Sequence, residues 1–274
     1  MSILPRLIKE RCVMKKFSLF LALLILVSVT ACKKKVEEPE MTPIPSETKD
    51  EGLTISLPDY PDVELSSEWE QNDITVENTV YEKTFSEGEI ERLTASGSFP
   101  KTGTAAIDVF YESALEDFKR LSETLAEEAG SIGTLGHLQA EFADEINAGG
   151  IFSVSRTISQ NIGGGSGGMT AICETFSVET GALLTLDDFF TVERDVYTER
   201  ILEYVDALID DSPDGFWPDA KQIARDLFPY DTFCVTNSGI SIFFSKYNIA
   251  PGTAGVVRMN IPWGGIAEWF ELPG

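Results

Sequence analysis

The sequence predicts an α+β fold in which helices pack on a mostly antiparallel sheet. Strand-like runs follow one another with short turns between them, and the helical runs are grouped rather than alternating singly with the strands. This grouping favours an α+β arrangement. The chain has 274 residues, of which 43% are hydrophobic, and this is enough for one large domain or two small ones.

The N-terminal segment has the pattern of an export signal. Lys15 and Lys16 precede Phe17–Val29, which is apolar apart from two serines and too short to span a bilayer as a stable helix. Small residues then lead to Cys32, and this ending resembles a bacterial lipoprotein signal, in which cleavage leaves the cysteine as the lipid-bearing N-terminus. We therefore expect a signal peptide at 1–31 and lipidation of Cys32, with the protein anchored to a bacterial membrane and facing the periplasm or the exterior. A plain secretory signal and an uncleaved anchor are the alternatives.

Two short segments flank this signal. Residues 1–13 carry charges that fit a signal poorly, so translation is expected to start at Met14 rather than Met1. Residues 32–51 contain lysine, glutamate, proline, serine and threonine with almost nothing apolar, a composition that cannot offset the entropy of ordering the chain. We expect a flexible tether there, with the lysines at 33–35 against the lipid headgroups.

The net charge of the chain narrows the classes of molecule that it is expected to bind. Without residues 1–31 the chain keeps 16 of its 21 basic and 44 of its 45 acidic residues, a net charge of −28. Such a field repels nucleic acid and anionic lipid, and it accelerates encounter with cationic partners. The alternative is that the charge only keeps an exported protein soluble.

The region 52–135 is expected to form a smaller α+β subdomain. Alternating apolar residues predict two antiparallel strands over 74–85 and 89–99. Thr104 then has the position of a helix N-cap, and apolar residues at three- and four-residue steps up to Gly130 predict one long amphipathic helix with an acidic outer face.

The region 136–274 is expected to form a second α+β subdomain. Three strand-like runs at 138–146, 151–162 and 169–178 predict a meander interrupted by glycine turns. Helical spacing follows, and the chain returns to strands before its end. The further elements expected here are an extended piece at 183–186, a helical turn from Asp187, helices at 196–209 and 220–227, a strand before the turn at 237–239, strands at 240–244 and 256–261, and a last helical turn at 266–270.

Two motifs resemble a catalytic or a metal-binding site, but the residues around them do not fit such a site. Gly164–Gly168 matches G-x-S-x-G around Ser166, but a nucleophile elbow needs a following helix and a later histidine, whereas a strand follows here and the single histidine, His137, comes earlier. Asp210-to-Gly215 imitates the start of a calcium loop, but Lys221 stands where the bidentate glutamate belongs, so a helix-terminating turn is favoured. We expect no catalytic residue, no metal site and no cofactor.

The remaining candidate residues have structural interpretations. His137 is expected to be a polar residue at a strand end. After lipidation of Cys32, a disulfide between Cys173 and Cys234 and two buried free thiols both fit the sequence. Three tryptophans could stack on sugar rings if exposed, but their place beside hydrophobic runs favours the core: Trp217, Trp263 and Trp269.

Two ordered segments carry a family resemblance. The first is Phe176–Phe190, which looks like the pattern F-x-x-x-T-G-x-x-L-x-L-x-D-L-F. The second is Gly239–Phe244 followed by Tyr247-Asn248-Ile249-Ala250-Pro251 and Gly255, with a strand ending in Ile261-Pro262 after it. They resemble the RsiV/PdaC-like family of extracytoplasmic domains, found in a lysozyme-sensing anti-sigma factor and in the non-catalytic N-terminal region of a peptidoglycan deacetylase. The match covers about residues 150–265, and the strand and long helix before it are similar to the smaller domain that usually precedes it. Family members often carry a Gly-Gly-Ala-His-Gly type loop where this chain has Gly164-Gly165-Ser166-Gly167-Gly168, so the histidine is missing here.

The resemblance implies a binding or sensing module without a catalytic domain. Its expected partners are the membrane, through Cys32, and a cationic protein such as lysozyme, or peptidoglycan, and no nucleic acid. A carboxylate- or metal-dependent cell-wall hydrolase and a purely structural envelope lipoprotein are the alternatives. Irregular glycine- and proline-rich segments are the candidate binding surface. Its residues are Gly164, Gly165, Ser166, Gly167, Gly168, Lys246, Tyr247, Pro251 and Gly252.

Overall fold

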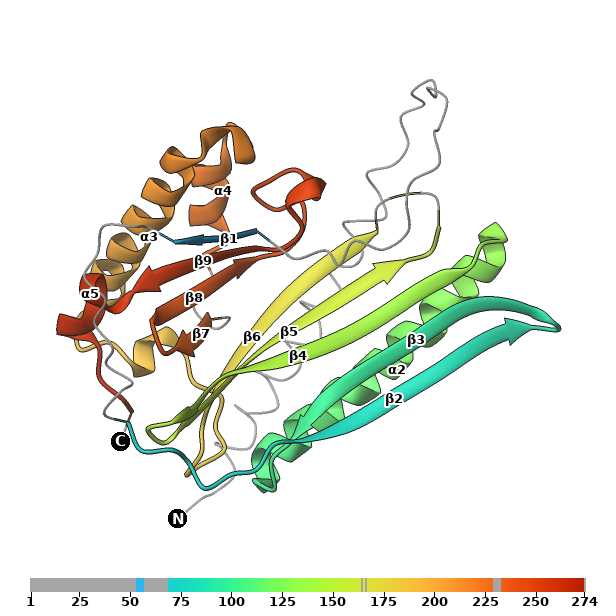
Figure 1. Ribbon diagram of the computed structural model, residues 1–274, viewed down its shortest axis with the longest axis horizontal. Helices are drawn as coiled ribbons and strands as arrows, with labels where there is room; N and C mark the ends of the chain where they lie inside the picture. Colours follow the sequence, from blue (N-terminus) through green and yellow to red (C-terminus); the bar gives the residue numbers. More distant parts are fainter. Residues whose placement is uncertain (1–52, 57–68, 164, 166, 229–232, 274) are drawn as a thin grey trace, which may run out of the picture. The chain divides into compact units, whose positions relative to one another are not determined.

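Two β-sheets with helices on them make up the fold, which a computed structural model describes for residues 53–56, 69–163, 165, 167–228 and 233–273 (Figure 1). The predicted signal peptide and tether lie outside these residues. The five-stranded sheet has the order β2-β3-β4-β5-β6. Its strands are β2 (Glu77–Glu87), β3 (Ile90–Lys101), β4 (Gly136–Ala148), β5 (Ile151–Asn161) and β6 (Gly168–Ser177).

The second sheet has four strands in the order β1-β9-β8-β7. They are β1 (Leu53–Ser56), β9 (Val257–Pro262), β8 (Gly239–Phe244) and β7 (Phe233–Thr236). The α-helices are α2 (Ala105–Ile132), α3 (Arg194–Asp211), α4 (Ala220–Asp226) and α5 (Trp263–Ile266). The 3-10 turns are η2 (Leu186–Asp188), η3 (Pro213–Gly215), η4 (Gly252–Ala254) and η5 (Ala267–Trp269).

The predicted α+β class and the mostly antiparallel pairing are confirmed. The hairpin β2–β3, the meander β4–β5–β6 and the strands β7–β8–β9 are antiparallel in register. Two pairs are parallel. The first joins β3 to β4 across the long helix α2, and the second joins β1 to β9. A parallel pair needs a long crossover, which α2 supplies for β3 and β4.

The long helix α2 covers one face of the five-stranded sheet (Figure 1). Thr104 occupies the N-cap position as predicted, but its side chain makes no capping hydrogen bond. Instead, the carboxylate of Asp108 accepts from the backbone N–H groups of Thr102 and Gly103, at 2.7 and 3.1 Å. The helix ends at Gly133, whose positive φ of 75° suits a left-handed C-cap, three residues beyond the predicted end.

Alternation along the strands separates a buried face from a polar face. Leu93 and Leu138 are buried residues of β3 and β4, and Ile107, Tyr111 and Phe118 are buried residues of α2, which packs on these strands. Along each strand, the side chains that alternate with the buried ones point to the other side of the sheet, because successive side chains of a strand alternate. These include Thr94, Ser96, His137, Gln139 and Ser159, all of them partly or fully exposed.

The four-stranded sheet and α3 enclose a second core. Helix α3 contributes Ile201, Val205 and Leu208, all fully buried, and the sheet contributes inward-facing aliphatic residues. Of the three tryptophans predicted to be core, Trp263 is fully buried and Trp269 is half-buried. The prediction that Trp217 lies in the core is wrong, because this residue follows η3 at the surface and is 38% exposed.

A disulfide and several hydrogen bonds join the two sheets. Cys173 of β6 and Cys234 of β7 are bonded, with Cα atoms 5.5 Å apart, which decides between the two states that the sequence left open. Nearby, Thr175 Oγ1 donates to Phe233 O at 3.1 Å. These contacts cover one end of the polar sheet face and leave the end near His137 uncovered.

The expected subdomain boundary at 135/136 lies between α2 and β4. Because β3 pairs with β4, the five-stranded sheet contains strands from both sides of that boundary. Asp50–Gly274 forms one compact unit. No helix among the described residues combines the length and apolar content that crossing a bilayer requires.

Candidate functional site

The structure brings together the two segments predicted as a binding surface. The glycine loop leads into β6, and the loop that follows β8 runs beside the start of that strand. Lys246 N donates to Met169 O at 2.9 Å, and Ser245 Oγ accepts from Ala171 N at 3.4 Å. Gly165, Gly167, Gly168 and the loop residues are described, whereas Gly164 and Ser166 lie outside the described residues.

A small cavity of about 140 Å³ opens where these segments meet, and we call it the glycine-loop cleft. Strands β4, β5 and β6 form its floor, and Lys246 forms part of its wall. Amide, hydroxyl, imidazole and ammonium groups line it, together with one thioether, and none of the lining residues is acidic. They are His137, Gln139, Ser159, Gln160, Asn161, Gly167, Gly168, Met169 and Lys246.

Asn161 shapes the loop at the rim of this cleft. Its Oδ1 accepts from Gly163 N at 2.7 Å, and its Nδ2 donates to Gly165 O at 3.0 Å. Gly167 has a positive φ of 61°, and a Cβ there would collide with the carbonyl of Gln160. The loop folds back onto the end of β5 because glycine tolerates both the conformation and the close approach.

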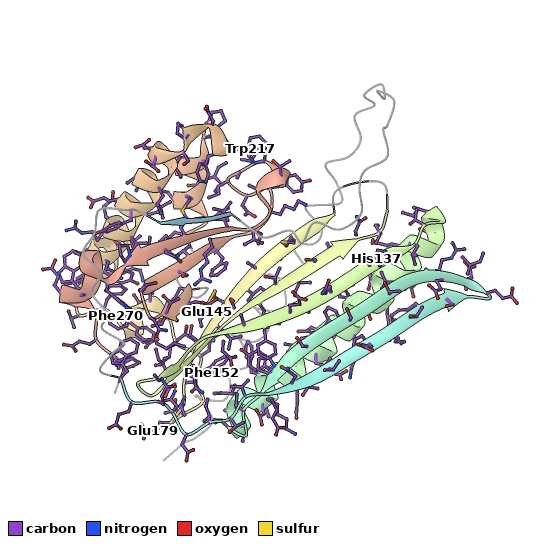
Figure 2. The ribbon with its side chains drawn as sticks, in the orientation of Figure 1. His137, Glu145, Phe152, Glu179, Trp217 and Phe270 are labelled. Carbon is purple, nitrogen blue, oxygen red and sulfur yellow. A yellow bond between two sulfur atoms is a disulfide. The ribbon has the colours of Figure 1, made fainter. Side chains whose placement is uncertain are left out.

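His137 lies near the start of β4, as predicted for a strand-end polar residue, and Figure 2 shows it far along that strand from Glu145. Its Nδ1 is 2.7 Å from Thr94 Oγ1 on the neighbouring strand. Sequence reasoning could not identify His137 as a residue of the cleft, because its position there depends on the pairing of β4 with β5.

Tyr247 adjoins the cleft through its neighbour Lys246. Its ring is held against Gly252, where any Cβ would collide with ring atoms, and Tyr247 itself has a positive φ of 73°. Half of the residue's surface is exposed, and Lys246 Nζ lies 5.7 Å from the ring centroid. Pro251 precedes η4 in the same loop, and Trp217 N donates to Ile249 O at 3.0 Å, which places a second exposed aromatic residue beside this loop.

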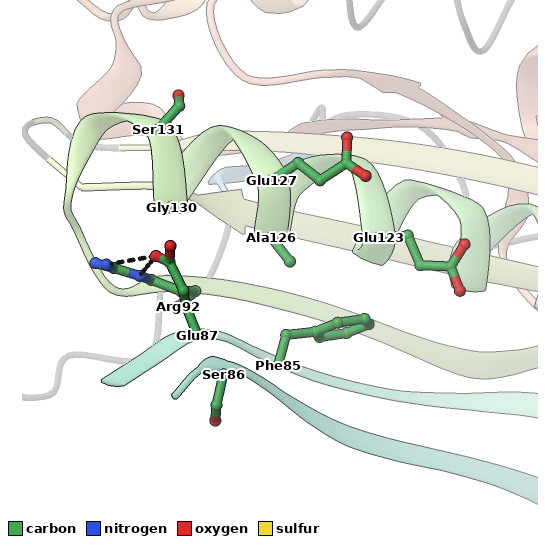
Figure 3. A pocket seen from close by; sticks show the side chains of 9 residues that line it. All are labelled: Phe85, Ser86, Glu87, Arg92, Glu123, Ala126, Glu127, Gly130 and Ser131. Atoms are coloured by element: carbon green, nitrogen blue, oxygen red, sulfur yellow. Dashed lines mark hydrogen bonds and ion pairs between the residues drawn. The ribbon is translucent and has the colours of Figure 1, made fainter. Parts of the chain in front are cut away.

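A larger cavity of about 560 Å³ lies between α2 and the end of the β2–β3 hairpin (Figure 3). We call it the acidic groove. Glu123 and Glu127 project from the helix, and Glu87 comes from the hairpin. Its full lining is Phe85, Ser86, Glu87, Arg92, Glu123, Ala126, Glu127, Gly130 and Ser131. The acidic outer face of the helix was predicted, but the hollow beneath it follows from how the hairpin packs on α2.

The charges of the acidic groove are only partly neutralised. Arg92 binds Glu87 at 2.8 Å, and Lys83 lies 3.9 Å from Glu123, with both lysine and glutamate well exposed. Glu127 has no basic partner among the described residues. Such exposed pairs exchange readily with solvent and other ions because each contributes little free energy.

A buried ionic cluster lies beneath α2, away from both cavities. Arg156 Nε donates to Glu174 at 3.0 Å, and Tyr111 Oη donates to the same carboxylate at 3.5 Å. Burial, followed by the charge of Glu174, raises the pKa of the Tyr111 hydroxyl well above its usual value. Burial would lower the pKa of Arg156, but the charge and hydrogen bonds of Glu174 outweigh it and raise that pKa. The cluster is closed to solvent, so it holds the helix on the sheet rather than binding a ligand.

The acidic patterns that the sequence suggested have local partners. Asp210 pairs with Lys221 at 2.6 Å, the residue that replaces the glutamate of a calcium loop. Asp188 closes a capping box with Thr185, and Asp187 accepts from Tyr197 Oη at 2.7 Å. No cluster of three metal-ligating side chains occurs within the part of the chain that the structure describes.

Part of the C-terminal region is similar to a known protein family. Residues 187–264 match the family described as "Protein of unknown function (DUF3298)". This segment is similar to DUF3298 domains. The family is the RsiV/PdaC-like one that the sequence resembles. A search of curated proteins found no match for the chain.

Two solved structures of DUF3298 proteins share the fold. A member from Bacteroides fragilis has 14% identity and a TM-score of 0.53, with 74% of this chain and 96% of that chain covered. A member from Pseudomonas aeruginosa has 17% identity and a TM-score of 0.54, with 74% and 99% covered. The aligned part of this chain is therefore longer than the segment 187–264 that the DUF3298 family matches.

Proposed function

We propose that the protein is a non-enzymatic binding module of the cell envelope, held at a bacterial membrane by a lipid on Cys32, which captures a cationic protein such as a lysozyme-like hydrolase. The observation that carries the proposal is the acidic groove between α2 and the β2–β3 hairpin. The lipoprotein signal and the Cys173–Cys234 disulfide support an extracytoplasmic location, since disulfides persist in oxidising compartments.

The groove suits an inserted lysine or arginine side chain. Glu123 and Glu127 offer carboxylates one helical turn apart, and Phe85 offers an aromatic ring that already lies 4.2 Å from Lys83 Nζ. A cationic partner would replace Lys83 at the ring and neutralise Glu127. The net charge of the whole protein adds long-range attraction, which accelerates association with a basic partner.

The test is calorimetric titration of the chain from residue 32, carrying Cys32→Ser to omit the lipid, with a C-type lysozyme at two salt concentrations. Saturable binding in the micromolar range or tighter that survives moderate salt is expected, because purely nonspecific charge pairing fades as the Debye length shrinks. The variant Glu123→Gln/Glu127→Gln should weaken binding at least tenfold.

The matched control is Glu112→Gln/Glu179→Gln, which removes the same charge from exposed positions outside the groove. Equal weakening by both variants would reduce the interaction to net charge and contradict the groove. The absence of saturable heat would refute the lysozyme-binding proposal and favour a purely structural lipoprotein.

A further inference from the structure

The outer edge of strand β2 has no strand beside it in the part of the chain that the structure describes. β2 ends the order of the five-stranded sheet, and its only partner there is β3 (Figure 1). Such an edge carries a row of unpaired backbone N–H and C=O groups that can accept another strand. Many proteins block it with proline or a bulge, but β2 contains no proline, and its register with β3 shifts only between Phe85 and Ser86. The segment Glu77–Phe85 therefore offers a long, regular edge.

The side chains of β2 separate a side that faces α2 from an open side. The Tyr81 ring packs edge-on against Phe118 of α2, with the ring centroids 5.8 Å apart. Because side chains alternate along a strand, Glu77 and Lys83 share this side, whereas Val80 points to the open side. Val80 is 65% exposed, although it lies within a strand. The fold of a single chain therefore leaves most of this valine in contact with water.

The pattern of charges along this edge selects a register for a second copy of the same strand. Two copies related by a two-fold axis perpendicular to the sheet pair antiparallel, and residues directly opposite each other point to the same side. An axis at Glu82 or Lys83 places two like charges opposite each other. An axis at Tyr81 places Val80 opposite Glu82. An axis at Val80 instead places the two valines opposite each other and Lys83 opposite Glu77 of the other copy.

Other positions of the axis fit less well. Closer to Phe85 the ladder runs into the register shift with β3, and closer to Glu77 it becomes short. With the axis at Val80, charges alternate across neighbouring strands, because Lys101 of β3 lies opposite Glu77 and Lys83 of the second copy would lie on its other side. Cross-strand pairs of opposite charge stabilise a sheet, and two facing valines remove each other's exposed surface from water.

From these observations we infer that two copies of the protein associate edge to edge through β2, so that the two five-stranded sheets join into one with the two-fold axis at Val80. The paired segment ends at Lys83, before Phe85, the first residue that lines the acidic groove. The groove therefore stays open in the dimer, and the inference does not rest on capture of a cationic protein. Because one strand from each copy makes a small interface, the expected dissociation constant is about 100 µM.

Salt should strengthen this association. Each copy carries a strongly negative net charge, so two copies repel each other over long distances. Salt screens this repulsion, whereas it screens the close contacts within the ladder much less. Sedimentation equilibrium of the chain from residue 32, carrying Cys32→Ser, should show a monomer–dimer equilibrium that tightens as salt is added. Attraction of a basic partner should instead weaken with salt, so the two interactions are distinguishable.

An added charge at the axis tests whether β2 forms the interface. Val80→Asp should weaken dimerisation at least tenfold, because it places two carboxylates opposite each other. Val109→Asp is the matched control: Val109 is 62% exposed on α2, and the same charge there should leave dimerisation unchanged. Thermal melting shows whether each variant keeps its fold. If Val80→Asp remains folded and dimerises as tightly as the unmodified chain, the interface does not involve β2.

A charge exchange tests the pairing of Lys83 with Glu77. Lys83→Glu places two glutamates in each charged pair, and Glu77→Lys places two lysines there, so each variant alone should dimerise more weakly than the unmodified chain. Mixed together, the two variants restore opposite charges in both pairs and should form a heterodimer about as tight as the unmodified dimer. A mixture that associates no more tightly than either variant alone would refute this register.

Engineered cysteines test the register directly, because Cys173 and Cys234 are already bonded to each other and leave no other thiol in this chain. Opposite residues of an antiparallel pair have Cα atoms about 4.5–5.5 Å apart, within the range of a disulfide, so Val80→Cys should form an interchain disulfide on mild oxidation. Thr84 would lie opposite Val76, so its two copies are about 27 Å apart and Thr84→Cys should not cross-link. Cross-linking of Thr84→Cys in place of Val80→Cys would overturn the register, and a chain that stays monomeric at millimolar concentration in high salt would overturn the inference as a whole.

Discussion

Arg258 on β9 and Glu145 on β4 form a two-pronged ion pair that joins the two sheets across 113 residues of sequence, with N···O distances of 3.0 and 2.8 Å. Glu145 is the residue skipped by the register shift between Asp144 and Ile146, so it is a bulge residue. The bulge turns its carboxylate toward the second sheet, where Ser155 Oγ also donates to it at 2.7 Å.

We expect Glu145→Ala to lower the free energy of unfolding by about 3 kcal/mol, because it leaves the largely buried Arg258 without its partner. Urea denaturation measures the change. Glu141→Ala, on an exposed position of the same strand, should change stability by about 0.5 kcal/mol or less. Equal losses in both variants would show that strand propensity, and not the ion pair, is responsible.

The disulfide should contribute strongly to stability, because Cys173 and Cys234 are 61 residues apart. Closing a loop of this length restricts the unfolded chain by about 4 kcal/mol in the chain-entropy account. The double variant Cys173→Ala/Cys234→Ala should therefore lose about 2–4 kcal/mol in guanidinium denaturation. Wild-type protein treated with reductant should match the variant; an unchanged midpoint after reduction would contradict this.

The buried pair Arg156–Glu174 should respond differently to single and double substitution. Glu174→Gln leaves a buried guanidinium unpaired and should cost about 3–5 kcal/mol. Arg156→Met/Glu174→Leu removes both charges, and its stability should lie within about 1 kcal/mol of the wild type or above it. Chemical denaturation of the three proteins tests this; a double variant as unstable as the single one would mean that the pair itself stabilises the fold.

Tyr111 should make stability depend on pH in the alkaline range. Its pKa is higher in the folded protein than in the unfolded chain, so the folded state keeps the proton as the pH rises above about 10 while the unfolded state releases it. Stability should therefore fall with rising pH above that value. Tyr111→Phe lacks this proton, so the difference in unfolding free energy between the two proteins should change between pH 9 and pH 11. A difference that stays constant over this pH range would contradict the raised pKa of Tyr111.

Individual strands and helices could be predicted because each is specified by the spacing of apolar residues within its own segment. Alternation of apolar residues located the strands of the β4–β5–β6 meander, and the spacing from Ile107 to Leu125 located α2. The glycine loop and the loop after β8 were also identified as candidate surfaces, since neither can form regular structure. Their meeting at Met169 could not be predicted, because it depends on packing between sheets.

The features that the sequence did not reveal depend on tertiary structure. The short β1 has only four residues, and nothing in its own composition specifies β9 as a parallel partner. Asp108 replaces Thr104 as the capping group because the turn before α2 brings its carboxylate back to the preceding N–H groups. Trp217 follows the apolar Phe216 in sequence but lies at the surface after η3, and the spacing of apolar residues cannot reveal its exposure.

The parallel pairing of β1 with β9 determines how the folded region would bear a mechanical load. Leu53–Ser56 is aligned with Val257–Asn260, and the chain continues upstream of Leu53 toward the cysteine expected to carry the lipid. A pull on that upstream chain acts along the axis of β1, across hydrogen bonds that run roughly perpendicular to the force. The bonds of this ladder must then shear together instead of opening one after another, so a strand of four residues can act as a mechanical clamp between the expected lipid anchor and the domain.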